Sequence, residues 1–267
     1  MMMRADLYLV EHGHASSRQR AKDLIEKGLV MIDGVALKKP SQPIDESEHT
    51  VVVNDDLPFV SRGGLKLAGA LERFGVSPQG KRALDIGAST GGFTDCLLQN
   101  GAISVCAVDA GQGQLVERLA VDPRVTSLEH TNARDLTLDM IGGERVDLIV
   151  MDVSFISATY ILPRFPALLQ SGGEAICLIK PQFEVGRAML GKGGIVKDAA
   201  AHQYAIRRVL ESATALGLTP VGLMPSPIEG GDGNREFLVH LTYMDNSRLP
   251  LSAQEIARVT AIGREGR

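Results

Sequence analysis

Four charged residues lie far apart along the 267-residue chain, at positions where a folded sheet would bring them together. They are Lys66, Asp152, Lys180 and Glu236. Asp152 follows the apolar run "VDLIVM", Lys180 follows "EAICLI", and Glu236 precedes "FLVHLTY". Charges in such settings are costly unless they are paired, and the carboxyl ends of parallel strands meet at one crevice. We therefore expect two amines and two carboxylates to converge there, a set suited to proton transfer.

A glycine-rich turn follows the first expected strand of this sheet, in "LDIGASTGGFTDCLL". Gly87, Gly91 and Gly92 let the backbone approach a ligand and pack the next helix on the strand. A phosphate-binding loop would carry G-K-[ST], which is absent, and Asp85 would lie close to the pyrophosphate of a dinucleotide. A cationic, phosphate-free nucleoside fits this turn better, because Asp85 can face its positive amino-acid end.

Asp109 lies near the end of the second expected strand, where an acidic residue can take both hydroxyls of a ribose. By analogy with Rossmann-like folds, we expect Asn132 and Ala133 to approach the edge of the adenine ring. Phe93 either forms a wall of the ligand site or belongs to the core. Together these features resemble the S-adenosylmethionine site of class I methyltransferases, which implies that S-adenosylmethionine is the cofactor. Its candidate cofactor-binding residues are Asp85, Gly87, Ser89, Gly91, Gly92, Phe93, Asp109, Asn132, Ala133 and Asp152.

The elements that must position these residues alternate between strand and helix from about residue 60 onward. Seven apolar segments are expected strands: 81–88, 103–111, 124–130, 145–155, 174–183, 219–228 and 235–244. Helices are expected between them, at 91–101, 114–122, 136–141, 161–173 (broken by prolines) and 199–218. This pattern predicts an α/β fold with a mainly parallel, Rossmann-like sheet. The last two strands are joined by a loop without a crossover helix, so the last strand is expected to be antiparallel.

The N-terminal segment, residues 1–56, reads as a separate small α+β unit. Two helices are expected first, and Ser16 or Ser17 can cap the second. A hairpin around Asp33-Gly34 and a strand at 51–53 follow. The expected domains are therefore this unit, a linker at 57–63, a catalytic domain at 64–245, and a tail or helix at 246–267.

Composition narrows the class of protein. The net charge of −4 indicates no overall basic surface, so any basic patch is local. No window approaches 18 consecutive apolar residues, so we expect no membrane-spanning helix. Charged residues appear too early in "MMMRADLYLV" for a signal peptide. Three cysteines without close spacing are typical of reduced thiols, and no His/Cys cluster has metal-ligand spacing. We expect a cytoplasmic protein without a metal, and the sequence indicates no oligomeric state.

Two patterns in this sequence resemble known families. The helix-turn-helix and hairpin pattern of about residues 4–50 resembles a ribosomal-protein-type RNA-binding module, the alpha-L motif. The K-D-K-E set matches the tetrad of FtsJ-like ribose 2′-O-methyltransferases, and further matches are "VSRGGLKL", "DIGASTGGFTDCLLQ", "MDVSFIS", "KPQFE" and "GNREF". With the N-terminal module ahead of this domain, the whole chain resembles the TlyA family.

The resemblance implies methylation of a ribose 2′-hydroxyl in ribosomal RNA, of a cytidine, with ribosomal RNA or a ribosomal subunit as partner. It implies catalytic roles for Lys66, Asp152, Lys180 and Glu236. Of the two lysines, we expect Lys180 to touch the hydroxyl. The resemblance also implies RNA contacts by basic residues of the small module, namely Arg4, Arg18, Arg20, Lys22 and Lys38.

Three other kinds of protein remain open at this point. They are a membrane-acting haemolysin, an RNA-binding protein with a non-catalytic methyltransferase fold, and a dehydrogenase. The lack of G-x-G-x-x-G disfavours the dehydrogenase.

Overall fold

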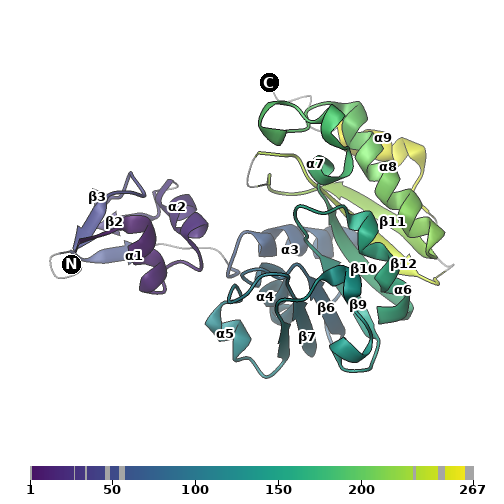
Figure 1. Ribbon diagram of the computed structural model, residues 1–267, viewed down its shortest axis with the longest axis horizontal. Coiled ribbons are helices and arrows are strands. Elements are labelled where there is room, and N and C mark those ends of the chain that lie inside the picture. The colour runs from purple at the N-terminus through teal and green to yellow at the C-terminus, as the bar shows by residue number, and fades with distance from the viewer. Residues whose placement is uncertain are drawn as a thin grey trace. The chain divides into compact units, whose positions relative to one another are not determined.

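The structure is a computed structural model that describes residues 2–26, 28–33, 35–45, 49–53, 58–230, 233–245 and 250–261. The chain divides between Arg62 and Gly63 into two compact units (Figure 1), which are described separately.

The first unit combines two helices with two small sheets. The helices are α1 (Ala5–Glu11) and α2 (Arg18–Glu26). β1 (Met2–Arg4) pairs with β4 (Pro43–Asp45), and β2 (Val30–Ile32) pairs with both β3 (Val35–Ala36) and β5 (Val51–Val53), all antiparallel. Ser17 Oγ accepts from Arg20 N at 3.2 Å, so Ser17 caps α2. Leu9, Leu24 and Ile44 are fully buried and form the centre of this small core.

Residues 58–62, within the segment expected to be a linker, belong to the first unit. Ser16 Oγ donates to the carbonyl oxygen of Val60 at 3.1 Å, and Arg62 Nη1 lies 3.5 Å from Asp23 Oδ2. These contacts extend the first unit to Arg62.

The second unit is built on a seven-stranded sheet in the order β11-β12-β10-β9-β6-β7-β8. The strands are β6 (Arg82–Ile86), β7 (Ser104–Val108), β8 (Val125–Leu128), β9 (Val146–Met151), β10 (Leu169–Ile179), β11 (Leu218–Pro225) and β12 (Phe237–Tyr243). β12 runs antiparallel to β10 and β11, while the pairs from β10 to β8 are parallel. The predicted fold class, a mainly parallel sheet with an antiparallel last strand, is confirmed.

Alternate residues of each strand face opposite sides of the sheet, and helices cover both sides (Figure 1). Leu84, Cys177 and Phe237 share one apolar cluster with α8 (Ala199–Ala215) and α9 (Ala253–Ala261). On the other side, α4 (Gly92–Gln99) packs on β6 and β7 and also contacts α3 (Gly63–Phe74). The remaining helical segments are short: α5 (Glu117–Ala120), α6 (Phe165–Leu168), α7 (Pro181–Glu184), and the 3₁₀ turns η1 (Ala133–Asp135), η2 (Asp139–Ile141), η3 (Ala158–Tyr160), η4 (Leu162–Arg164), η5 (Arg187–Met189) and η6 (Lys192–Gly194). Among the described residues, no helix combines the length and apolar character that a membrane crossing needs.

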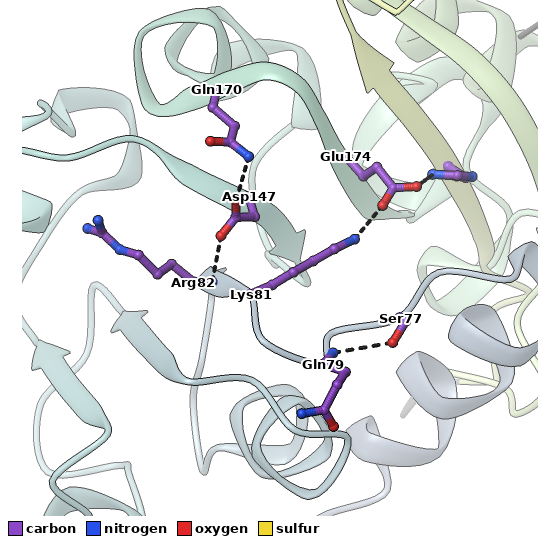
Figure 2. A network of polar contacts seen from close by, with 8 residues as sticks. Ser77, Gln79, Lys81, Arg82, Asp147, Gln170 and Glu174 are labelled. Atoms are coloured by element: carbon purple, nitrogen blue, oxygen red, sulfur yellow. Dashed lines mark hydrogen bonds and ion pairs between the residues drawn. The ribbon is translucent and has the colours of Figure 1, made fainter. Parts of the chain in front are cut away.

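Polar contacts join neighbouring strands toward the amino end of β6 (Figure 2). Lys81 Nζ donates to Glu174 Oε2 at 2.6 Å, and His240 Nε2 lies 3.1 Å from Glu174 Oε1. The His240 hydrogen bond, helped by Lys81, lowers the pKa of Glu174 to about 2 against the opposing effect of burial. Asp147 of β9 accepts from Arg82 N at 2.8 Å and also from Gln170. These contacts fix the strands at the end opposite to the catalytic candidates.

Candidate functional site

The structure brings the four charged candidates together at the carboxyl ends of the parallel strands. Asp152 directly follows β9 and Lys180 directly follows β10, while Glu236 directly precedes the antiparallel β12. Lys66 reaches the same point from the first turns of α3. Lys66 Nζ lies 2.6 Å from Glu236 Oε2 and 3.7 Å from Asp152 Oδ2, and Lys180 Nζ lies 2.6 Å from Asp152 Oδ1.

The four side chains of this cluster are largely buried and their charges cancel. The four side chains are between 3% and 18% exposed, and two positive charges face two negative ones. Buried charges persist only when they are paired in this way. Lys180 Nζ also donates to Ser154 Oγ at 2.7 Å, a contact that the sequence did not suggest. The arrangement therefore holds two lysine amines in fixed positions, where either can meet a hydroxyl.

A cavity of about 560 Å³ opens beside Asp152 and has the size typical of small-molecule sites. Of the predicted cofactor-binding residues, it is lined by Gly87, Ser89, Asp109, Asn132, Ala133 and Asp152. Apolar side chains, among them Val108, Ile156 and Ile161, line it as well. Asp85, Gly91, Gly92 and Phe93 lie outside this lining.

The glycine-rich turn has the close backbone packing that its composition predicts. Gly87 has φ +86°, and a Cβ there would overlap the carbonyl oxygen of Asp152. Gly91, at φ +97°, directly precedes α4 as its N-cap residue, and a Cβ there would overlap the Leu119 side chain. Only glycine fits these two positions without displacing neighbouring atoms.

Asp85 lies beneath this turn and is completely buried. Its Oδ2 accepts from Thr94 Oγ1 of α4 at 2.7 Å, and Oδ1 has no hydrogen-bond partner within the described part of the chain. Burial raises the pKa of Asp85 to about 7, despite the opposing Thr94 hydrogen bond. A direct contact between Asp85 and a cationic ligand stays a prediction.

Asp109 ties two loops together at the cavity wall. Its Oδ2 accepts from Ser89 N at 2.8 Å and its Oδ1 accepts from Gly111 N at 2.7 Å. Each carboxylate oxygen keeps a second lone pair for a ribose hydroxyl. Asn132 is engaged differently, since its Oδ1 accepts from Arg134 N at 3.1 Å and so caps η1.

Comparison with known proteins identifies the family. A model of FtsJ-like methyltransferases matches residues 59–243, and a model of the S4 domain matches residues 3–49. The 16S/23S rRNA (cytidine-2′-O)-methyltransferase TlyA of Mycobacterium tuberculosis is 45% identical over 260 residues, which cover 97% of each chain. The chain belongs to the TlyA family. The predicted family is thus confirmed, and with it S-adenosylmethionine as the cofactor.

Two further relatives of this TlyA-family chain carry the hemolysin name. Hemolysin A of Brachyspira hyodysenteriae is 42% identical over 238 residues, covering 89% of this chain and 99% of the relative. A solved structure from Streptococcus thermophilus superposes with a TM-score of 0.80 at 40% identity, covering 97% of this chain and 94% of that one.

The cavity of this TlyA-family chain fits the cofactor by the chemistry of its walls. Glycine at position 87 leaves room against the Asp152 backbone, Asp109 offers paired carboxylate oxygens, and apolar side chains suit an adenine ring. Gly87, Ser89 and Asp109 would hold the nucleoside part, and S-adenosylmethionine supplies an electrophilic methyl group when bound.

The basic residues predicted to contact RNA lie in different settings on the S4 domain. Arg4 Nε and Arg18 Nη2 both lie 3.0 Å from the buried carboxylate of Asp6, and the Arg4 hydrogen bond is the main reason that the pKa of Asp6 falls to about 2. Lys38 is exposed and Lys22 is half-buried. Arg20 is only 5% exposed, although the other candidates reach the surface.

Two features near the site were missed at the sequence level. Glu184, at the end of α7, is buried and accepts from Ser157 Oγ at 2.5 Å and from Ala158 N at 2.8 Å. It therefore clamps the loop that follows Asp152 to the helix that follows Lys180. Phe155 is 91% exposed with φ +64°, a backbone conformation unfavourable for an aromatic residue. It lines the cavity and lies 5.4 Å, between ring centroids, from Phe183.

Proposed function

We propose that the protein transfers the methyl group of S-adenosylmethionine to the 2′-hydroxyl of a cytidine in ribosomal RNA. The observation that carries this proposal is the convergence of Lys66, Asp152, Lys180 and Glu236 beside the cavity. The RNA class and the cytidine come from the name of the Mycobacterium tuberculosis relative.

The proposed mechanism assigns each of the four residues a task. A ribose hydroxyl is a weak nucleophile, so it must lose its proton as it attacks. Lys180 Nζ holds the hydroxyl and, in its neutral amine form, accepts that proton and becomes the ammonium, while Asp152 and Ser154 fix Lys180 by contacts of 2.6 and 2.7 Å. Lys66, held by Glu236, lies on the other side of Asp152 and completes the pocket for the oxygen. Base assistance of this kind contributes roughly 10²- to 10⁴-fold, and alignment contributes the rest.

The S4 domain supplies RNA affinity in this proposal, through Arg4, Arg18, Lys22 and Lys38, with the buried Arg20 supporting them. Such contacts to phosphates position an RNA without reading its sequence. The substrate is a ribosomal subunit or its RNA, and the relative's name includes both 16S and 23S RNA. The enzyme would accordingly work in the cytoplasm, where ribosomes are.

The test is transfer of a tritiated methyl group into small and large ribosomal subunits from a strain that lacks this gene, with the modified nucleotide mapped. The Lys180→Ala variant should lose at least about 10²-fold in kcat and keep its S-adenosylmethionine affinity within a few-fold. Lys81→Ala is the matched control, because Lys81 also makes a 2.6 Å ion pair but lies at the other end of the sheet. Wild-type protein that labels neither subunit would refute the proposal.

The hemolysin name of two relatives raises membrane damage as a second candidate. Release of a dye from phospholipid vesicles tests it directly. We expect no release at protein concentrations that fully methylate the subunits, and release that survives in Lys180→Ala would establish a separate activity.

A further inference from the structure

The three residues directly before β12 each anchor a different part of the second unit. Asn234 Oδ1 accepts from Val196 N at 3.0 Å, in the loop after α7. Arg235 reaches the carboxyl end of α9, and Glu236 reaches Lys66 in α3. Of these contacts, only that of Glu236 belongs to the catalytic cluster, so the role of Arg235 needs its own explanation.

Arg235 donates hydrogen bonds to backbone carbonyl groups near the carboxyl end of α9. Its Nη1 donates to the carbonyl oxygen of Thr260 at 3.0 Å, and its Nη2 donates to that of Val259 at 2.9 Å. The last carbonyl groups of a helix lack partners within the helix and attract a cation. The guanidinium carbon also lies 5.2 Å from the centre of the Phe237 ring. Half-burial of the side chain lowers the pKa of Arg235 without removing its charge.

Adjacent side chains of an extended strand point to opposite faces of a sheet. Arg235 lies on the same face as Phe237, which packs in the cluster that includes Val259 of α9. Glu236 must therefore point to the opposite face, and there it meets Lys66. A shift of one residue in the pairing register of β12 would exchange these two directions and turn Glu236 away from Lys66. Ser226 N donates to the carbonyl oxygen of Glu236 at 2.8 Å, so the ladder already begins at this residue.

We propose that Arg235 is a positioning residue that couples the C-terminal helix α9 to the catalytic carboxylate Glu236. By holding the end of α9, Arg235 fixes the register in which β12 begins and thereby the direction of Glu236. α9 lies outside residues 59–243, the part that matches the FtsJ-like family. In this proposal α9, a helix outside the methyltransferase core, helps to hold Glu236 in place, and Glu236 in turn aligns Lys66. This inference rests on the proposed methyl transfer.

The test is a double-mutant cycle on kcat, measured with saturating subunits and S-adenosylmethionine. Arg235→Met should lower kcat by about tenfold or more, because small misplacements at a site are costly. Cofactor affinity should stay within about twofold, since Arg235 does not line the cavity. In a Glu236→Gln background the same change should alter kcat by less than about twofold, because Arg235 acts through Glu236. Arg235→Lys, which keeps a donor, should recover most of the activity.

Gln203→Leu is the matched control. Gln203 Nε2 donates to Thr260 Oγ1 at 3.1 Å and so holds the same end of α9 from α8, without passing through β12. It should lower the unfolding temperature and leave kcat within about twofold. Equal losses of kcat from Gln203→Leu and Arg235→Met, or additive losses in the cycle, would overturn the proposal.

A second cycle on the unfolding midpoint separates this proposal from the methyl-transfer proposal. The shift caused by Arg235→Met should shrink in the Glu236→Gln background even if the wild type labels no RNA. Inactive wild-type protein would sink the methyl-transfer proposal, whereas additive midpoint shifts would sink the coupling through Arg235. Should the Arg235→Met chain not fold, Arg235→Lys carries both cycles, with an expected loss in kcat of about threefold that vanishes in the Glu236→Gln background.

Discussion

Asp85 gives the sharpest quantitative prediction, because it is a fully buried carboxyl group. Burial raises its pKa from 3.8 to about 7. The folded protein therefore prefers the protonated form, and the stability contributed by Asp85 is fully present below about pH 3.8 and lost as pH rises through about 7. A shift of about 3 units corresponds to about 4 kcal/mol, at about 1.4 kcal/mol per unit.

The Asp85→Asn variant isolates this effect. The amide cannot ionise, and it can accept the same hydrogen bond from Thr94. Near pH 4 the variant and the wild type should differ little in free energy of unfolding. Between pH 4 and 7 the variant should become progressively more stable than the wild type, with a slope of up to about 1.4 kcal/mol per pH unit and a plateau of about 4 kcal/mol.

Urea unfolding of wild type and variant at half-unit intervals between pH 2 and 8 measures this difference. Asp122→Asn is the control with the opposite sign, because the Arg124 hydrogen bonds lower the pKa of Asp122 to about 2. As pH rises from about 2 to 4, that variant should become less stable than the wild type. Above pH 5 the difference in free energy of unfolding between the two should stay constant. A constant difference between Asp85→Asn and wild type across the whole range would refute the reasoning about Asp85.

Three further predictions concern the cavity, the clamp and the RNA surface. Asp109→Ala removes the acceptor for two backbone N–H groups and should weaken S-adenosylmethionine binding by about 10- to 100-fold in calorimetry; unchanged affinity would contradict the assigned role. Glu184→Ala leaves a buried backbone N–H unpaired and should cost about 1 to 3 kcal/mol in thermal unfolding at pH 7. Glu184→Gln should cost less, because an amide oxygen can still accept and because burial raises the pKa of Glu184, which penalises the ionised carboxyl at this pH. Lys38→Ala should weaken RNA binding and reduce its salt slope by about 0.7 to 0.9, as expected for one lost phosphate contact; an unchanged slope would place Lys38 outside the interface.

Local sequence patterns predicted the parts of the fold that local forces determine. Continuous apolar runs predicted the strands of the main sheet, and charges at their ends predicted which side chains would meet. Lys180, for example, follows "EAICLI" and directly follows the end of β10 at Ile179, although the expected strand continued to Phe183.

Elements set by distant contacts were predicted less well. A proline-broken helix was expected to continue to Gly173, but the helical segment ends at Leu168 and β10 begins at Leu169. Leu169 pairs with Val146 of β9, a partner that no local pattern reveals. The expected helix at 114–122 is reduced to Glu117–Ala120. The pair formed by β1 and β4 joins segments about 40 residues apart and was missed for the same reason.

The site shows the same division between local and distant information. Asp109 was predicted to face ribose hydroxyls, but its two contacts to backbone N–H groups depend on the path of two loops. Phe155 is exposed and has a positive φ, and the local pattern of "MDVSFIS" indicates neither.

The place of β12 also has a consequence for how the chain matures. It is the last strand of the main sheet to be synthesised, yet it is inserted between β10 and β11. Until residues 237–243 emerge from the ribosome, β10 presents a bare backbone edge, which invites pairing with other chains. Over the same interval Lys66 has no Glu236 to meet. The nascent chain therefore carries an unpaired and aggregation-prone β10 edge until β12 has been synthesised.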